Sequence, residues 1–512
     1  MAVPLNKVRC LSTFRSVSGD VMKLSPITLE ADQVLYEQVA ERLQTLIMEG
    51  TLKAGDRLPS VRKLRQQLSV SMSTVLEAYR LLEDRGLVTV RPQSGYYVKS
   101  TALNVLQEPA ITIPTTDEAR EIDTPLSLRL MLAAQNPEIV QLGTALPALS
   151  LMPLSQLNRL TGKILRDRPE YAHAYASPLG DEGLRTEIAK RMLNTGCAVA
   201  PDDLLITNGA SEALYFSLQA VTQPGDTVAV QSPTYHTVLE SLKKLNLKAL
   251  TLPTHPRDGI SLAHLEAALQ TQSIKVLLLV SNFSNPLGSC MDDDKKKQLM
   301  TLLNRYDVPL IEDDVYGELY FTGDRPKAIK AFDTEHRVLY CSSLSKVLSP
   351  GLRIGWCAAG RYQAAVTGHK SVTNLSTAIA PQLTAAAFLA NGGFDRHLRQ
   401  LRRAYYEQMT RMQQAIADYF PAESRVTRPN GGHVLWVEMP AGFDAFAFYK
   451  AALAENISVV PGFMFSASGH DYCNCFRLNT AVPWSDSLDQ AMQTLGQLAK
   501  KQLAQQWLSD LP

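Results

Sequence analysis

Residues 342–353 read SSLSKVLSPGLR and directly follow a short apolar run at 338–340. The stretch places Lys346 seven residues before Arg353, with Ser343 just upstream of the lysine. A lysine amine can form an imine with an aldehyde, and an arginine offers the planar pair of donors that a phosphate prefers. A serine–lysine string alone is a weak signal. With an arginine at this offset it is strong, and it predicts a nucleophilic lysine beside a phosphate-binding group.

The region around this stretch has the pattern of a buried sheet. Residues 125–512 alternate helical patterns with short apolar runs, such as 228–230, 276–280 and 309–311. Apolar runs of this length between helices indicate a parallel or mixed sheet that is buried on both faces. We therefore expect an α/β fold for this region.

Further ordered motifs accompany the lysine stretch. They read TNGASEAL at 207–214, SPTY at 232–235, NFSNPLG at 282–288, IEDDVY at 311–316 and FRLN at 476–479. The first of them is a strand-to-helix turn whose small residues let backbone amides approach a phosphate at the helix N-terminus. Chance rarely retains such a set in order. Residues 125–512 thus resemble fold-type-I aminotransferases of class I along essentially their whole length.

The resemblance implies pyridoxal 5′-phosphate as the cofactor, bound through Lys346. It also implies a large mixed-sheet α/β domain followed by a smaller C-terminal α+β domain. An aspartate paired with the pyridine nitrogen keeps the ring protonated and makes it an electron sink. We assign this role to Asp313, because its three-residue spacing to Tyr316 matches the family. Asp314 remains the competing choice.

Other roles in the cofactor and substrate site follow from the resemblance, position by position. Tyr316 and Asn285 would bind the ring hydroxyl, although an Asn-Pro pair alone is usually just a turn. Tyr235 would stack on the pyridine face, where the alternative is core packing. Arg477 would clamp the α-carboxylate of an amino acid, and Gly143 would line the same pocket.

The phosphate group would have its own set of contacts. The backbone amides of Ala210 and Ser211 would hold it at a helix N-terminus, together with the side chains of Ser343 and Arg353. Tyr175 matches the position from which the family reaches the phosphate of the neighbouring subunit. That last role implies a homodimer.

The N-terminal part of the chain has a different pattern. Within residues 34–99, apolar residues at 35, 39, 43 and 47 lie on one helical face, and two shorter helical patterns follow. Alternating residues at 87–91 and 96–98, around a turn at 92–95, predict a hairpin. Three short helices and a hairpin predict a winged helix-turn-helix. Residues 58–83 and 86–98 resemble the GntR winged-helix family.

The charge of this module fits a DNA-binding role. Residues 34–99 hold ten basic and seven acidic residues, a net of +3, whereas the whole chain is at +1. The resemblance places a DNA-contacting arginine at Arg62, and hydroxyl residues open the third helix, where backbone N–H groups can meet a phosphate. The expected DNA contacts are Arg62, Ser71, Ser73, Thr74, Gln93 and Gly95.

The module departs from its family at two positions. Met72 and Leu76 are apolar where many GntR members carry arginines that can read guanine edges. The base-reading rule of the family therefore does not carry over. Met72 could touch a thymine methyl, or base reading could fall to Ser73, Thr74 and the wing at Gln93. A module that only mediates association with another protein is the alternative.

The remaining segments and the composition complete the expected organisation. We expect a disordered extension at 1–33, with Met22 as a possible true start, and an interdomain linker at 100–124. The near-equal 51 basic and 50 acidic residues exclude a globally basic nucleic-acid coat. Seven cysteines without a CxxC pair fit a reducing cytoplasm, and the apolar runs are too short for a membrane helix.

A winged helix joined to an aminotransferase-like domain is the arrangement of the MocR subfamily of GntR regulators. The resemblance implies a cytoplasmic transcription factor that binds double-stranded DNA at two half-sites and carries pyridoxal 5′-phosphate. It would respond to an amino acid, an amine or the vitamin itself, as a homodimer with exchanged domains. Two alternatives stay open: a working aminotransferase with an appended DNA module, and a regulator whose cofactor is structural or reports cofactor supply alone.

Overall fold

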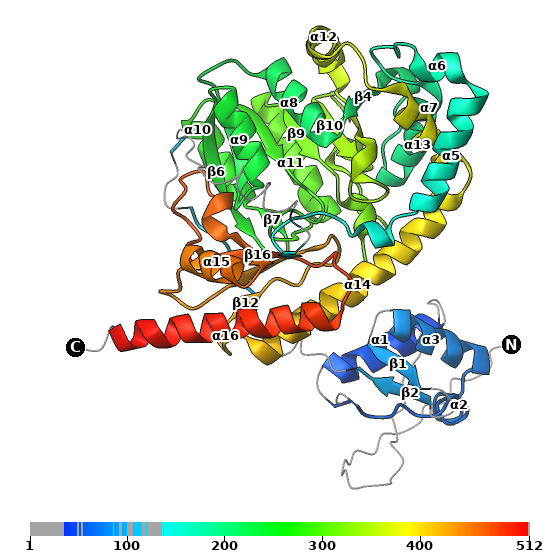
Figure 1. Cartoon of the computed structure of the whole chain (residues 1–512), viewed down its shortest axis with the longest axis vertical. Coiled ribbons are helices and arrows are strands. Elements are labelled where there is room, and N and C mark those ends of the chain that lie inside the picture. The colour runs from blue at the N-terminus through cyan, green and yellow to red at the C-terminus, as the bar shows by residue number, and fades with distance from the viewer. Residues whose placement is uncertain are drawn as a thin grey trace, which may run out of the picture. The chain divides into compact units, whose positions relative to one another are not determined.

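The computed structural model describes residues 35–48, 51–52, 55–84, 87–91, 95–99, 106–114, 118–119, 136 and 138–509. The chain divides into two compact units, residues 1–105 and 106–512 (Figure 1). The extension expected at 1–33 lies outside the described residues. Within the segment expected to be a linker, residues 106–114 contact the second unit. There Leu106 is buried, and Thr112 Oγ1 donates a hydrogen bond to Thr254 O at 2.9 Å.

The first unit is a winged helix-turn-helix, as the sequence predicts. Its elements are α1 (Leu35–Met48), α2 (Val61–Leu68), α3 (Met72–Asp84), β1 (Val88–Arg91) and β2 (Gly95–Val98). The two strands pair antiparallel, and apolar residues of all three helices form one core. Ser60 caps α2, and the Ser71 hydroxyl accepts from Thr74 N at 3.0 Å at the start of α3. Hydroxyl caps therefore fix both helix starts.

The second unit is built on an eight-stranded mixed sheet. In spatial order its strands are β4 (Leu205–Asn208), β11 (Ile354–Ala358), β10 (Val338–Ser343), β9 (Leu310–Asp313), β8 (Ile274–Leu279), β5 (Thr227–Ser232), β6 (Lys248–His255) and β7 (Gly259–Ile260). The run from β10 to β6 is parallel, whereas β11 is antiparallel to both neighbours and β7 is antiparallel to β6. The strands are buried almost throughout, as expected for a sheet with helices on both faces. Asn208, Ser232, Asp313 and Ser343 end four strands at one edge, where α/β sheets bind ligands.

Helices pack on the large sheet or on the helices that cover it. They are α5 (Leu154–Asp167), α6 (Pro169–His173), α7 (Glu182–Met192), α8 (Ala210–Val221), α9 (His236–Lys244), α10 (Leu262–Thr271), α11 (Asp293–Tyr306), α12 (Gln363–Thr373) and α13 (Ile379–Ala390). Two core clusters show the result: one contains residues of α5, α7 and α13, and another contains residues of α8 and α9 with strands of the sheet.

A smaller C-terminal domain follows the long helix α14 (Gly393–Tyr419). Its sheet has the order β12 (Arg425–Val426), β13 (Val434–Glu438), β16 (Cys475–Asn479), β15 (Val460–Pro461), and α15 (Ala445–Ala454) and α16 (Asp486–Ser509) pack beside it (Figure 1). A separate pair, β3 (Val140–Gln141) with β14 (Ile457–Ser458), ties residues 140–143 to this domain. The expected fold class is confirmed. In the described part of the chain, no helix is long and apolar enough to cross a membrane.

Candidate functional site

A cavity of about 320 Å³ opens at the carboxyl-terminal edge of the large sheet. Its size falls in the range of small-molecule sites. Strand ends, the N-terminus of α8, the start of α9 and the loop after β10 contribute to its wall. Of the residues expected to contact the cofactor, those that line it are Ala210, Ser211, Tyr235, Asn285, Asp313, Tyr316, Ser343, Lys346 and Arg353.

Lys346 brings an amine into this cavity. Its Nζ donates a hydrogen bond to Ala145 O at 2.6 Å. Burial lowers the pKa of Lys346 to about 8, and the positive charge of Arg477 adds to the shift. A substantial fraction of the amine is therefore neutral near pH 8. That is the form in which a lysine acts as a nucleophile.

The two consecutive aspartates at the end of β9 face opposite ways. Asp313 lines the cavity, and burial raises its pKa to about 7. Asp314 instead accepts hydrogen bonds from Arg325 Nη2 at 2.6 Å and from Tyr340 OH at 2.9 Å, on the other side of the strand. Side chains alternate along a strand, so only one of the pair can reach the cavity. This geometry favours Asp313 over Asp314 as the partner of a ring nitrogen.

A chain of hydrogen bonds joins the two domains beside the lysine. Arg477 Nη1 donates to Asn285 Oδ1 at 3.0 Å, and Asn285 Nδ2 donates to the Tyr316 hydroxyl at 3.3 Å. Arg477 Nη2 also donates to Gly143 O. The sequence motifs that carry these four residues lie far apart in the chain. Asn285 and Tyr316 line the cavity, whereas Arg477 and Gly143 lie behind this lining and are joined to it through the Arg477–Asn285 bond.

Arg477 is a buried cation that suits an anionic ligand. It is 1% exposed, lies over the Phe465 ring at 5.1 Å, and forms an ion pair with no carboxylate among the described residues. Its Nε is buried without a hydrogen-bond partner in the same part of the chain. Burial lowers the pKa of Arg477. Because an unpaired buried charge is costly, the site favours a ligand carboxylate.

The N-terminus of α8 forms a cradle for an anion. Gly209 precedes the helix at φ +77°, and no side chain caps the first turn, which leaves its N–H groups available. Arg353 Nη2 donates to Asn208 O at 2.8 Å, so its guanidinium lies against this turn. An added Cβ at Gly209 would lie 2.3 Å from Arg353 Nη2. These residues fit the phosphate of pyridoxal 5′-phosphate.

Gly355 tests this cradle. An added Cβ there would lie 2.4 Å from Gly209 C, which is rigid backbone. We expect Gly355→Ala to lower the free energy of unfolding by about 2 kcal/mol and to weaken cofactor binding, because the α8 turn must shift. Calorimetry and a cofactor titration measure the two effects. Gly368→Ala, which has nothing within 4 Å of the added carbon, is the matched control. Equal behaviour of the two variants would contradict the account.

Three of the expected site residues, Tyr175, Arg477 and Gly143, do not line the cavity, and two residues that the motifs did not assign, Ser345 and His433, lie at the site. Tyr175 is 85% exposed and does not line the cavity of its own chain. Ser345 does line it. The His433 ring packs edge-on against Tyr316 at 5.4 Å, and burial lowers the pKa of His433 to about 3, so it is neutral. The only sequence feature near His433 that indicated a functional segment was the glycine pair directly before it. His433 reaches the site because of the way β13 folds.

The candidate DNA contacts are mostly accessible in the first unit. Arg62 on α2, Ser73 on α3 and Gly95 on β2 are exposed. Thr74 is half-buried, and the Ser71 hydroxyl is engaged as the cap of α3. Gln93 lies outside the described residues. Met72 is 50% exposed, so an apolar side chain is available where the helix begins.

Comparisons with known proteins agree with both units. Residues 158–495 match the family described as aminotransferase class I and II, and residues 35–98 match the bacterial regulatory proteins of the gntR family. The chain is 42% identical to the uncharacterized HTH-type transcriptional regulator YdcR of Escherichia coli K12, over 91% of this chain and 99% of that protein. It is 37% identical to YjiR of the same strain, another uncharacterized HTH-type transcriptional regulator, over 90% and 98%.

Solved structures match the second unit. The α-aminoadipate aminotransferase LysN of Thermus thermophilus, complexed with N-(5′-phosphopyridoxyl)-L-leucine, superimposes with a TM-score of 0.69 at 29% identity. The match covers 75% of this chain and 96% of that one. The kynurenine aminotransferase of Pyrococcus horikoshii gives the same TM-score, identity and coverage.

Proposed function

Because the chain belongs to the GntR regulators that carry an aminotransferase class I and II domain, the MocR arrangement, we propose that an amino compound bound at Lys346 controls its binding to DNA. The chain is a DNA-binding transcriptional regulator with a pyridoxal 5′-phosphate fold. One observation carries the proposal. The second unit holds a site with the amine of Lys346, the buried carboxylate of Asp313 and the buried Arg477, and the same chain also has an intact winged helix. A pure DNA-binding protein has no need of these groups.

Each part of the cavity suits one part of the cofactor. Bound pyridoxal 5′-phosphate supplies an aldehyde to amines and a ring that withdraws electrons. We assign Lys346 to its covalent attachment and Asp313 to the ring nitrogen. Tyr316 and Asn285 would bind the ring hydroxyl, and Tyr235 would pack on the ring face. Ala210, Ser211, Ser343 and Arg353 would contact the phosphate, and Tyr175 would reach the cavity of a second copy in the proposed homodimer.

The same residues define the class of effector. Arg477 would pair with a carboxylate of the ligand, and Lys346 lies where an amino group of the ligand would meet the cofactor aldehyde. A Lys346 amine with a pKa near 8 can then take up or hold a proton at Nζ. An α-amino acid offers both the carboxylate and the amine. Its capture would shift the small domain, which carries Arg477, and so alter the spacing of two DNA-binding heads on a two-half-site operator in the cytoplasm.

A second candidate function is transamination, from an amino acid to a 2-oxo acid. It is favoured by the neutral fraction of Lys346, since a nearby amine can move protons on the ligand. Relatives of the second unit are named as aminotransferases. The fold does not separate turnover from sensing.

A spectral titration separates these functions. Purified, cofactor-loaded protein is titrated with a panel of amino acids and amines, and keto acid is assayed in parallel. We expect at least one compound to shift the absorbance of the bound cofactor without accumulation of keto acid. Keto acid formed over many turnovers with a second acceptor would instead establish the aminotransferase. If no compound of the panel shifted the absorbance of the bound cofactor, the proposal that the protein senses these amino compounds would be wrong.

Arg62 tests the DNA-binding unit. We expect Arg62→Ala to weaken binding to all duplex sequences alike and to reduce the salt dependence of binding by about one unit of slope, the effect of one lost phosphate contact. Fluorescence anisotropy at several salt concentrations measures both quantities. Arg403→Ala, at an exposed position of α14, is the control. An unchanged slope in Arg62→Ala would show that this side chain does not contact phosphate.

A further inference from the structure

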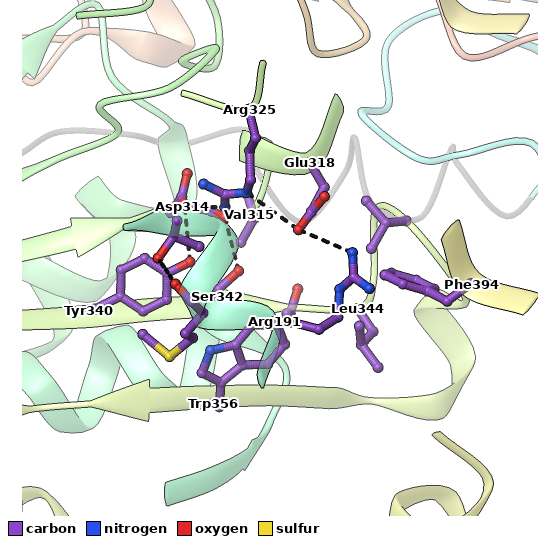
Figure 2. A pocket seen from close by; sticks show the side chains of 14 residues that line it. Arg191, Asp314, Val315, Glu318, Arg325, Tyr340, Ser342, Leu344, Trp356 and Phe394 are labelled. Atoms are coloured by element: carbon purple, nitrogen blue, oxygen red, sulfur yellow. Dashed lines mark hydrogen bonds and ion pairs between the residues drawn. The ribbon is translucent and has the colours of Figure 1, made fainter. Parts of the chain in front are cut away.

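The carboxylate of Asp314 is buried behind the wall of the cofactor cavity. It is 2% exposed and lines a second, smaller cavity of about 30 Å³ (Figure 2). Val315 and Ser343 line both cavities, so the two spaces lie on either side of the same strand ends. The charge of Asp314 therefore lies close to Asp313, although the two side chains point in opposite directions.

Three donors hold the Asp314 carboxylate. Oδ2 accepts from Arg325 Nη2 at 2.6 Å and from Tyr340 OH at 2.9 Å, and Oδ1 accepts from Asn282 Nδ2 at 2.9 Å. Ser342 Oγ also donates to Asp314 O at 2.9 Å. Of these donors only Arg325 carries a charge. It is thus the direct counter-ion of Asp314.

The fold around Arg325 is arranged for this pair. Its side chain is 7% exposed and lies between Asp314 and Glu318, whose Oε1 is 3.3 Å from Arg325 Nε (Figure 2). Arg402 in turn holds Glu318 at 3.0 Å. A Cβ added at Gly317 would lie 2.4 Å from Asp314 Oδ1 and 2.7 Å from Arg325 Nη2. A glycine at 317 leaves the room that the ion pair needs.

Three acidic residues follow one another at this strand end. Glu312 is held by the Ser281 hydroxyl at 2.6 Å and by two backbone amides. The charged groups whose fields act on Asp313 are Asp314, Lys346 and Glu312. Like charges disfavour the ionised form of a carboxyl group. The pKa of Asp313 is raised to about 7, chiefly by burial, and the charge of Asp314 contributes to this rise. An uncompensated Asp314 would therefore favour a protonated Asp313.

We propose that Arg325 is a positioning residue for the cofactor: by neutralising Asp314, it keeps Asp313 ionised and available to the ring nitrogen. Arg325 does not line the cofactor cavity, so it acts only through the two aspartates. The inference rests on the proposed role of Asp313. It extends that role to a residue that no motif of the site contains.

The test compares the cofactor affinity of full-length wild type with that of full-length variants. We expect Arg325→Gln to raise the dissociation constant of pyridoxal 5′-phosphate at least about tenfold, the equivalent of one pKa unit. The double variant Arg325→Gln/Asp314→Asn removes both charges and should return the affinity to within about threefold of wild type. Arg305→Gln, which breaks an exposed ion pair with Glu266, is the matched control and should change the affinity by no more than about twofold.

The outcomes separate charge compensation from structural support. Wild-type affinity in a folded Arg325→Gln protein overturns the proposal, and so does a double variant that binds as weakly as the single one. If Arg325→Gln does not fold, Asp314→Asn and the double variant decide. Both should bind within about threefold of wild type, and a larger loss in either overturns the proposal. Because apo protein and free cofactor suffice, failure of the effector-controlled DNA response would leave this result untouched.

Discussion

Replacement of Lys346 by alanine is expected to abolish covalent attachment of pyridoxal 5′-phosphate while the protein stays folded. Lys346 supplies the only amine side chain among the described residues that line the cavity. Lys346 belongs to none of the hydrophobic core clusters, so its removal leaves these clusters intact. Borohydride, which makes a lysine–cofactor bond permanent, should add the mass of the cofactor to wild type and nothing to the variant. Intact-protein mass spectrometry reads the difference directly.

The same substitution is expected to uncouple the two units. Lys346→Ala should retain affinity for duplex DNA, because the winged helix is unchanged, but lose every response of that affinity to amino compounds. Lys275→Ala, at an exposed position of β8, is the control and should behave as wild type. A Lys346→Ala protein that responds to each compound as wild type does would rule out signalling through this lysine.

Substitution of Arg477 is expected to remove recognition of the ligand carboxylate. Arg477→Gln should weaken binding of a responsive α-amino acid by about 100-fold, since a buried charge pair is lost. The corresponding amine without a carboxylate should bind the variant and wild type almost equally. Absorbance titrations of the loaded proteins measure both affinities. The comparison of two ligands on one variant controls for any change in cofactor binding.

Arg477→Lys refines this expectation. The variant keeps a positive charge but loses the planar pair of donors, so its affinity for the amino acid should fall between those of wild type and Arg477→Gln. Thermal unfolding checks that the bonds to Asn285 and Gly143 are not required for folding. If the amine and the amino acid lost affinity equally in Arg477→Gln, the carboxylate assignment would be wrong.

The sequence predicts candidate site residues best where a single short segment contains them. The offset between Lys346 and Arg353 lies within a single loop, and the strand-end position of Asp313 follows from the apolar run before it. The three-residue spacing to Tyr316 favoured Asp313 over Asp314 from the sequence, although both residues lie at the end of the same strand. Only the hydrogen bonds of Asp314 to Arg325 and Tyr340 show which of the two faces away from the cavity.

Residues that reach the site through tertiary packing left no usable signal. His433 and Phe465 lie in the small domain, and their positions beside Tyr316 and Arg477 depend on how β13 and the segment after β15 fold. Arg325 lies eleven residues beyond Asp314 in an irregular segment without periodicity. Tyr175 cannot be assigned within one chain, because its expected target belongs to a second copy.

The limits of the two units were harder to predict than their folds. Residues 106–114 contain prolines and no apolar period, which indicates a linker. In the structure, part of this segment bonds to β6 through Thr112, and Leu106 is buried against the small domain. These two contacts involve single residues and require no periodic apolar pattern. The sequence therefore shows no sign of them.

Ligand capture at Lys346 is expected to change the affinity of the protein for DNA. The most direct test measures the affinity of full-length, cofactor-loaded protein for a duplex obtained by selection from random DNA. It is measured with and without the compound that shifts the absorbance of the bound cofactor. We expect a change of at least about fivefold in wild type, the coupling expected of an allosteric effector, and no change in Lys346→Ala. Identical affinities with and without the compound in wild type would contradict it.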